Sequence, residues 1–278
     1  MTNMVEKYIS RLRNEDCVVV AGVGCGLTAK AAVRGGADIL GVYNTAVYRI
    51  QGVPTAMAFL PYDDCNALTL AHAPQVIAVA GDKPVVLGFG AHDPRRSLDG
   101  LLDCAEELGA AGVTNEPFIG MYGGDLRRQM EHLGLGFERE LQLISKAVKR
   151  GMLALGWVFT PEEAKAMVET GCAIIGIMVG GVTSGRAAGG VAGASLEESV
   201  VTINEIIAAI EAAVGSGERP LILIHGGPLN DPSSVETALQ QTGADGYVTG
   251  STGERIPVEQ SVAAAIASFK RLPKGAMK

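Results

Sequence analysis

Residues that can donate or accept protons lie at the ends of several apolar segments of this sequence. His225 ends the run LILIH, and Asp93 follows another apolar run in the segment HDP. An imidazole titrates near neutral pH and a carboxylate can accept a proton, so these two residues are candidates for acid/base catalysis. Two alternatives stay open, a hydrogen-bonded structural histidine and an aspartate that binds a metal or caps the next helix.

Further polar residues follow the same kind of run and suit the handling of a small acid. Asn44 and Asn115 are candidates to orient a substrate, and Glu116 adds a carboxylate beside the second of them. Arg49 is suited to clamp a carboxylate or a phosphate. Asp64, in the segment LPYDDCNAL, is a candidate for substrate binding or for a helix cap.

Glycines beside a hydroxyl indicate an anion site. The segments IHGGP and TGST contain Gly226, Gly227, Gly250 and Ser251 after the last two apolar runs. Bare backbone N–H groups can approach an oxyanion there, and the serine hydroxyl can donate as well. The alternative is that these glycines only form tight turns.

A second glycine cluster lies near the N-terminus. Gly22 and Gly24, in AGVGCG, resemble half of a dinucleotide-binding fingerprint. The third glycine is misplaced, and no acidic residue ends the next apolar run to hold a ribose. We therefore expect close approach of the backbone to a ligand rather than nucleotide binding.

Three other kinds of chemistry receive little support. No lysine ends an apolar run, so a Schiff base with the substrate is not expected. No HxH or HExxH motif signals a zinc site. No cofactor is indicated with certainty, and a Mg²⁺ ion held by one or two carboxylates and the substrate stays open.

The elements that must position these residues repeat one pattern. A helix ends in glycine, small residues follow, and an apolar run without polar alternation begins, which is typical of a parallel strand covered on both faces. Helical segments, some with capping boxes, lie between the runs. The candidate strands are residues 17–22, 38–43, 84–89, 112–115, 152–157, 173–179, 221–225 and 246–249.

This pattern predicts one domain, 1–278, folded as an α/β (β/α)₈ barrel (a TIM barrel) with an extra N-terminal helix at 4–13. An open doubly wound sheet is the alternative. Three long connections, 44–62, 117–137 and 180–194, all follow strands and fall on one rim. Active sites of such barrels form at that rim.

Composition narrows the class of partner and the compartment. The formal net charge is −7 and no run of Lys or Arg is present, so nucleic acid is not an expected partner. No apolar segment is long enough for a membrane span, and none resembles a secretory signal. Five cysteines without CxxC spacing predict reduced thiols in the cytoplasm. We expect a small anionic metabolite as ligand and a homo-oligomer.

The motifs together resemble the phosphoenolpyruvate hydrolase-like family of TIM-barrel proteins, over about residues 20–257. The segments that carry the resemblance are GLTAKAAVRGGADILGVYN, LPYDDCNAL, HDPRRSLD, LGLGFERELQLI, FTPEEAKAM, GVTSG, IHGGPLNDP and ERIP. The residues that fall on motif positions are Asn44, Arg49, Asp64, Asn66, Asp93, Asn115, Thr183, His225, Gly226, Gly227, Ser251 and Glu254. Glu116 and His92 depart from the family pattern.

The resemblance implies a barrel similar to indole-glycerol-phosphate synthase and to the phosphoenolpyruvate mutase/isocitrate lyase group. Together with the strand-end residues, it favours a hydrolase or lyase with acid/base chemistry on a small phosphoenolpyruvate-like or 2-oxo acid. The alternative is a non-catalytic barrel that senses a ligand or binds a protein, because fold alone does not fix function. An exposed apolar patch on the rim would favour that alternative.

Overall fold

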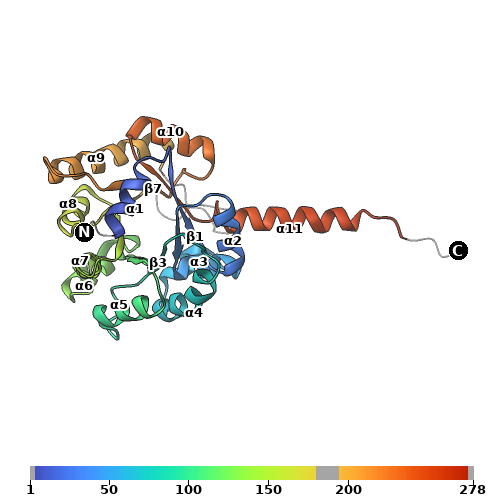
Figure 1. Ribbon diagram of the computed structural model, residues 1–278, viewed down its shortest axis with the longest axis horizontal. Helices are drawn as coiled ribbons and strands as arrows, with labels where there is room; N and C mark the ends of the chain where they lie inside the picture. The colour runs from blue at the N-terminus through green and yellow to red at the C-terminus, as the bar shows by residue number, and fades with distance from the viewer. Residues whose placement is uncertain (1–3, 180–193, 275–278) are drawn as a thin grey trace.

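Eight parallel strands close into a barrel in the computed structural model, which describes residues 4–179 and 194–274 (Figure 1). Each strand pairs with its neighbours in chain order, and β8 closes the barrel on β1 through pairs such as Val18 with Gly246. The predicted closed barrel is thereby confirmed, and the open sheet is wrong. The strands are β1 (Val18–Gly22), β2 (Ile39–Val42), β3 (Val85–Gly88), β4 (Gly112–Thr114), β5 (Leu153–Val158), β6 (Ile174–Met178), β7 (Leu221–His225) and β8 (Gly246–Thr249).

Helices surround the strands, and short helices also occupy the connections at the carboxyl ends of the strands. The expected extra helix is α1, whose Ile9 and Leu12 pack with residues from inside the barrel. The helices are α1 (Met4–Leu12), α2 (Gly26–Arg34), α3 (Asn44–Ile50), η1 (Thr55–Phe59), α4 (Cys65–Ile77), α5 (Leu98–Glu107), η2 (Ile119–Met121), α6 (Gly124–His132), α7 (Phe137–Lys149), α8 (Pro161–Glu169), α9 (Leu196–Val214), α10 (Pro232–Thr242) and α11 (Arg255–Lys270).

Alternation along each strand divides the core into two layers. Residues such as Val18, Val20 and Val86 point into the barrel and pack around Trp157 and Phe118. Their neighbours point outward and pack against the helices. This alternation decides which strand-end side chains can reach the space at the mouth of the barrel.

Two of the three long connections contain helices. The segment 44–62 forms α3 and η1, and the segment 117–137 forms η2 and α6. The third, at 180–194, falls almost entirely outside the described residues, as does the whole GVTSG motif with Thr183.

The last helix behaves differently from the others. α11 leaves the barrel near α2 and runs away from the body (Figure 1). Within the described residues, no helix is long and apolar enough to cross a membrane. All five cysteines are unpaired, as the sequence predicts.

Candidate active site

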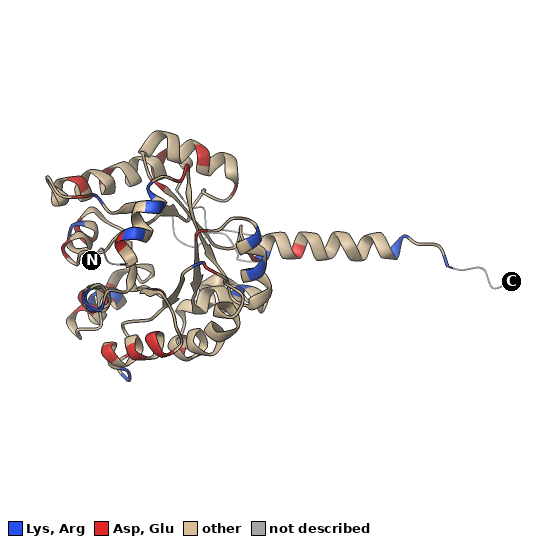
Figure 2. Cartoon of the chain, viewed as in Figure 1, with Lys and Arg blue, Asp and Glu red and all other residues tan. Residues whose placement is uncertain are grey.

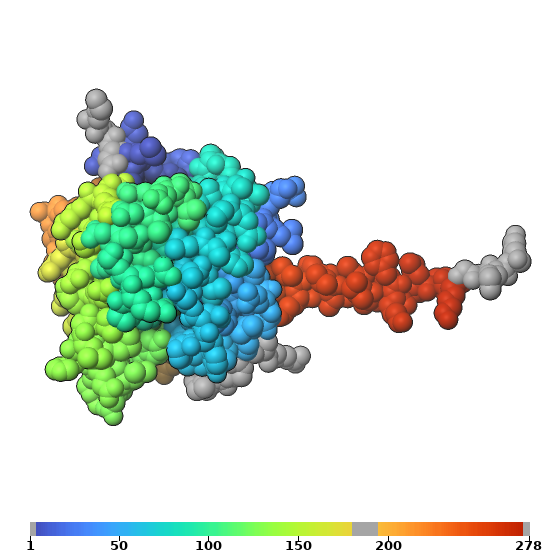
Figure 3. Space-filling model, turned by 90° about the horizontal axis from the view of Figure 1, so that it is seen from below, coloured from blue at the N-terminus to red at the C-terminus, as the bar shows by residue number. Residues whose placement is uncertain are grey.

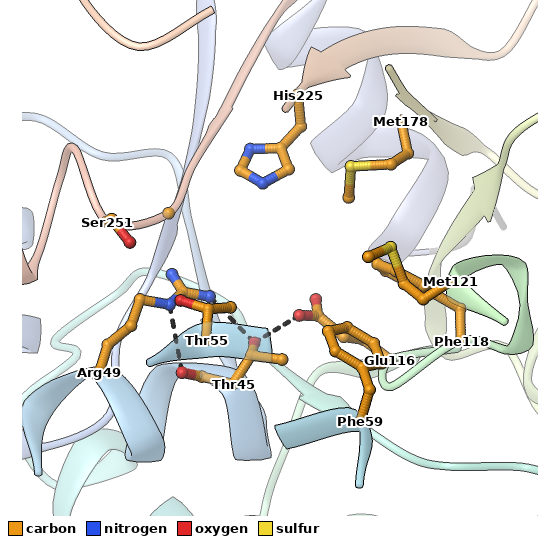
Figure 4. Close-up of a pocket in the computed structure, with 11 residues that line it drawn as sticks. Thr45, Arg49, Thr55, Phe59, Glu116, Phe118, Met121, Met178, His225 and Ser251 are labelled. Carbon is orange, nitrogen blue, oxygen red and sulfur yellow. Dashed lines mark hydrogen bonds between the residues drawn. The ribbon is translucent and has the colours of Figure 1, made fainter. Parts of the chain in front are cut away.

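A small cavity opens at the carboxyl end of the strands, with a volume of about 40 Å³ (Figure 4). Its wall comes from five regions that are far apart in sequence, each at the end of a strand or in the connection after it. One side carries polar groups and the other is apolar. The lining residues are Thr45, Arg49, Thr55, Phe59, Glu116, Phe118, Met121, Met178, His225, Gly250 and Ser251.

Arg49 supplies a buried cation to this cavity. It lies on α3 and is 4% exposed. Its Nε donates to the carbonyl of Thr45 at 3.1 Å, and its Nη2 donates to the Thr45 hydroxyl at 2.9 Å. Nη1 has no hydrogen-bond partner among the described residues. A buried N–H group without a partner is costly, so this atom is suited to bind an oxyanion.

Glu116 joins the same chain of hydrogen bonds. Its carboxyl Oε1 accepts from the Thr45 hydroxyl at 2.5 Å, so Thr45 links it to Arg49 (Figure 4). Burial raises the pKa of Glu116 to about 7, although Arg49 and the hydrogen bond from Thr45 act to lower it. A carboxyl group with this pKa can hold a proton near neutral pH and release it to a substrate.

His225 lies across the cavity from these residues (Figure 4). Its Nδ1 lies 2.7 Å from the carbonyl of Val248, which can only accept, so Nδ1 carries the proton. Burial, and to a smaller extent Arg49, lowers the pKa of His225 to about 4. The ring is therefore neutral at pH 7, and its Nε2 is a base.

Gly250 keeps the space between the cation and the base open. A Cβ atom at this position would lie 2.9 Å from His225 Cε1 and 3.1 Å from Arg49 Nη1. Ser251 follows it in the cavity wall. Of the four residues predicted to surround an anion, Gly250 and Ser251 line the cavity.

The other two, Gly226 and Gly227, form the turn after β7 and do not line the cavity. Their φ angles of 93° and 53° belong to the left-handed region that favours glycine. The alternative left open by the sequence, that these glycines only form a tight turn, therefore fits Gly226 and Gly227.

Gly22 and Gly24 approach protein groups rather than open space. A Cβ at Gly22 would lie 2.2 Å from the hydroxyl oxygen of Tyr43, whose ring fills the barrel interior there. The amide of Gly24 donates to Glu254 Oε1 at 2.6 Å. Gly22 faces Tyr43 and the Gly24 amide already has a partner, so the placement differs from the expected approach to a ligand.

Glu254 is a buried carboxyl group beside the cavity to which the sequence analysis assigned no role. Its Oε1 also accepts from Thr28, and its Oε2 has no hydrogen-bond partner among the described residues. That oxygen lies 4.0 Å from Arg49 Nη1. Burial raises the pKa of Glu254 to about 7. The only sequence signal was its position in the ERIP motif.

Asp93 and Asp64 lie outside the cavity in a cluster with two arginines. Asp93 Oδ1 accepts from the side chain of Arg95 at 2.9 Å, and Asp64 Oδ2 accepts from Arg96 at 2.7 Å. Asp64 also caps α4 by accepting from the amide of Ala67. These partners outweigh burial and lower the pKa of both carboxyl groups. Asp93 is thus held ionised, and it does not line the cavity that contains His225. This placement does not suit the proton transfer that the sequence predicts for Asp93.

The two asparagines also differ from the expected placement, because their amides bind the protein itself. Asn115 donates to Glu140 at 2.6 Å and accepts from the amide of Trp157 at 2.7 Å. Asn44 donates to the carbonyl of Ala58 at 2.7 Å. Neither lines the cavity. They hold the connections that carry the cavity wall.

The sequence interpretation missed most of the apolar wall. Phe59, Phe118, Met121 and Met178 lie at the mouth beside the polar groups. Phe59 and Met121 belong to the short helices η1 and η2, within the long connections. Nothing in their residue types separates them from ordinary core residues.

The described part of the chain has few side chains placed together that could bind a metal ion. No group of three or more His, Cys, Asp or Glu residues there is arranged to hold an ion. The carboxylates of Asp64 and Asp93 are committed to arginines. A Mg²⁺ ion held by one or two carboxylates and the substrate is a smaller site than such a group, and it stays a prediction.

Comparisons with known proteins support the sequence resemblance. A family model described as phosphoenolpyruvate hydrolase-like matches residues 3–272. The ToMV resistance protein Tm-1(GCR237) of Solanum lycopersicum is 34% identical over 98% of this chain, and the match covers 36% of that protein. The putative transcriptional regulatory protein y4pA of Sinorhizobium fredii is 32% identical over 91% of this chain and 41% of its own length. The chain thus spans about two fifths or less of these relatives.

Solved structures share the fold at low identity. A phosphoenolpyruvate phosphomutase from Streptomyces platensis subsp. rosaceus has a TM-score of 0.60 at 15% identity, over 95% of this chain and 85% of its own. Oxaloacetate acetylhydrolase in complex with oxalate has a TM-score of 0.61 at 13% identity, over 99% of this chain and 89% of its own. A 2,3-dimethylmalate lyase of the PEP mutase/isocitrate lyase superfamily has a TM-score of 0.59 at 14% identity. The match covers 100% of this chain and 91% of that one.

Proposed function

The chain belongs to the phosphoenolpyruvate hydrolase-like family, and we propose that its barrel is an enzyme that cleaves a small anionic acid. The expected substrates are 2-oxo acids and phosphoenolpyruvate-like acids. One observation carries the proposal: the unpartnered Nη1 of Arg49 faces a cavity that also holds a neutral imidazole and a carboxyl group with a pKa near 7. A cation, a base and an acid are the parts that acid/base cleavage of an anion needs.

In the proposed reaction, each group acts according to its protonation state. Arg49 Nη1 binds a carboxylate or phosphate oxygen of the substrate. His225 Nε2 accepts a proton from a substrate hydroxyl in a lyase reaction, or from water in hydrolysis. Glu116 then donates its proton to the carbon or oxygen atom at which the broken bond leaves negative charge. The apolar wall restricts water and favours a short substrate.

The choice of test compounds follows the names of the structural neighbours. They include a phosphonopyruvate hydrolase, an oxaloacetate acetylhydrolase and a dimethylmalate lyase. All three names specify small carboxylic acids. At this level of identity the likeness shows the fold alone, so the compounds are candidates for this chain.

The experiment is a turnover screen of phosphoenolpyruvate, phosphonopyruvate, oxaloacetate and 2,3-dimethylmalate, with and without added Mg²⁺. Any compound that reacts is then tested with His225→Gln and Glu116→Gln, each expected to lower kcat by roughly 10²–10⁴-fold. His132→Gln, on an exposed helix, is the matched control and should keep full activity. Wild-type turnover by both cavity variants would contradict the assigned catalysis.

A second candidate is a barrel that binds a small acid without converting it. The names of three relatives favour it, since they refer to virus resistance, virus susceptibility and transcriptional regulation. Binding of one of the four acids without turnover, lost in Arg49→Gln, would favour this candidate over the enzyme.

A further inference from the structure

One buried acid at the mouth of the barrel has no part in the proposed reaction. Many charged residues lie on the outer helices, as Figure 2 shows, but Glu254 is only 1% exposed. It follows β8, where the chain leaves the barrel beside α2 and enters α11 (Figures 1 and 3). A hydrogen bond from the amide of Ile256 to the carbonyl of Ser251 spans this turn. A carboxyl group buried this deeply needs partners for both of its oxygens.

The protein itself satisfies one of the two oxygens. Glu254 Oε1 accepts from the amide of Gly24 at 2.6 Å and from the hydroxyl of Thr28 at 3.2 Å. The loop after β1 can come this close because a Cβ atom at Gly24 would clash with the carbonyl oxygen of Ala46 on α3. Since two donors point at Oε1, a proton that binds this carboxyl group belongs on Oε2.

The second oxygen of Glu254 lies beside the cation of the cavity. Oε2 is 4.0 Å from Arg49 Nη1, which is too far for a hydrogen bond. Neither atom has a hydrogen-bond partner among the described residues, and both side chains are almost fully buried. When Oε2 carries a proton, two buried donors therefore lie next to each other without an acceptor. An oxygen atom of an anion has the lone pairs to accept from both.

The surroundings of Glu254 favour its protonated form at and below neutral pH. Burial raises its pKa to about 7, while Arg49 and the hydrogen bonds to Oε1 act to lower it. Tyr43 interacts with Glu254 and stays neutral, because burial raises the pKa of its phenol well above the usual value. Glu116 acts on the same guanidinium of Arg49. On the other side, His72 bonds to the loop after β1.

We propose that Glu254 binds the anion together with Arg49, by donating a hydrogen bond from Oε2. The same carboxylate or phosphate oxygen then accepts from Arg49 Nη1 and from the Oε2–H group. If Glu254 is ionised before binding, one proton from the solvent joins Oε2 as the anion enters. The inference rests on the anion site of the proposed function but not on catalysis, and Glu254 acts as a binding residue.

The test is calorimetric titration of the whole chain with oxalate at pH 6 and pH 8. Glu254→Gln keeps an acceptor for Gly24 and Thr28 and places an amide N–H where Oε2 lies. It should bind oxalate like wild type at pH 6. At pH 8, where only about a tenth of the wild-type Glu254 is protonated, it should bind up to about tenfold more tightly than wild type.

Two further variants separate a hydrogen-bond donor from a competing charge. Glu254→Met removes both the charge and the donor, so it should bind oxalate about tenfold or more weakly than wild type at pH 6. A mere competing charge predicts no loss at that pH. Circular dichroism checks that this variant is folded. Glu205→Gln, at an exposed position of α9, is the matched control and should follow wild type at both pH values.

Proton uptake tests the proposal without the methionine variant. The heat of oxalate binding at pH 8, measured in buffers of different ionisation enthalpy, gives the number of protons taken up. Wild type should take up more than Glu254→Gln, by close to one proton. Because Glu116 titrates in both proteins, the difference between them reports on Glu254.

The outcomes distinguish this inference from the proposed function. Equal proton uptake and equal affinity at pH 8 in wild type and Glu254→Gln would overturn the role of Glu254 and leave the anion site standing. Wild-type affinity of folded Glu254→Met at pH 6 would overturn it as well. Binding as expected without turnover of any acid would contradict the enzyme alone. Failure of wild type to bind oxalate at either pH would contradict both.

Discussion

At the scale of single residues, the cavity balances one cation against two buried carboxyl groups. Arg49 lies between Glu116, reached through Thr45, and Glu254. If both carboxyl groups were ionised, the three side chains would carry a net charge of −1 and repel an anion. Because burial raises both pKa values to about 7, the carboxyl groups are largely neutral below that pH. The cation is then available to a ligand.

This balance predicts the pH dependence of turnover. His225 must be neutral to act as a base, so activity should rise as pH increases through about 4. Glu116 must be protonated to act as an acid, so activity should fall as pH increases through about 7. The measurement is kcat/KM against pH for a compound that reacts. A profile that keeps rising above pH 8 would contradict this assignment of acid and base.

The sequence predicted part of this site at the level of residues. Arg49, Glu116, His225, Gly250 and Ser251 all lie at the cavity, as the strand-end rule suggests. The rule fails for Asn115 because it specifies the edge of the barrel and not the direction of a side chain. Asn115 instead bonds to Glu140 and Trp157, partners on α7 and β5 that sequence spacing does not reveal.

At the scale of elements, the end of β8 controls the size of the cavity. Gly250→Ala should weaken binding of a small acid about tenfold or more, because its Cβ would contact both His225 and Arg49. Calorimetric titration measures the effect. Gly123→Ala is the matched control, since a Cβ there meets open space at an ordinary φ of −111°. Equal affinity in Gly250→Ala and wild type would place the ligand elsewhere.

The hydrogen bonds of Asn115 should appear as stability of the rim rather than as catalysis. Asn115→Ala removes the side-chain partner of the Trp157 amide and of Glu140 Oε2, while Glu140 Oε1 still accepts from the amide of Ile119. At about 1–3 kcal/mol for each unsatisfied group, we expect a loss of at least about 2 kcal/mol in the free energy of unfolding. Urea denaturation measures it, with the exposed Asn14→Ala as control. A change below about 0.5 kcal/mol would show that these bonds contribute little.

The strands were easier to predict from the sequence than the short helices in the connections at the mouth of the barrel. All eight came from apolar runs bounded by glycine, because burial on both faces gives a strong composition signal. The short helices α3, η1 and η2 lack such a signal, since contacts distant in sequence stabilise them. The bond from Asn44 to Ala58 is one such contact.

At the scale of the whole molecule, three buried carboxyl groups link stability to pH. Burial raises the pKa of Glu116, Glu140 and Glu254 from 4.5 to about 7, 8 and 7. The folded chain therefore binds more protons than the unfolded chain between these values, and stability falls as pH rises from about 5 to 8. Below about pH 4 the trend reverses, because Asp64 and Asp93 have lowered pKa values and lose their ion pairs when protonated.

The free energy of unfolding at a series of pH values measures this dependence. Glu116→Gln removes one of the three groups, so its slope near pH 6 should be smaller by up to about 1.4 kcal/mol per pH unit. Glu197→Gln, at an exposed position of α9, is the matched control for the substitution. Stability that increases between pH 5 and 8 would contradict the burial of these groups as neutral acids.

The central claim is that a small acid binds between Arg49 and His225, and a crystal structure with oxalate tests it most directly. Oxalate is small, and its carboxylates resemble those of a 2-oxo acid. We predict a carboxylate oxygen within hydrogen-bond distance of Arg49 Nη1, beside Gly250 and facing His225 Nε2. Oxalate bound only elsewhere on the chain, with Nη1 still unpartnered, would contradict the claim.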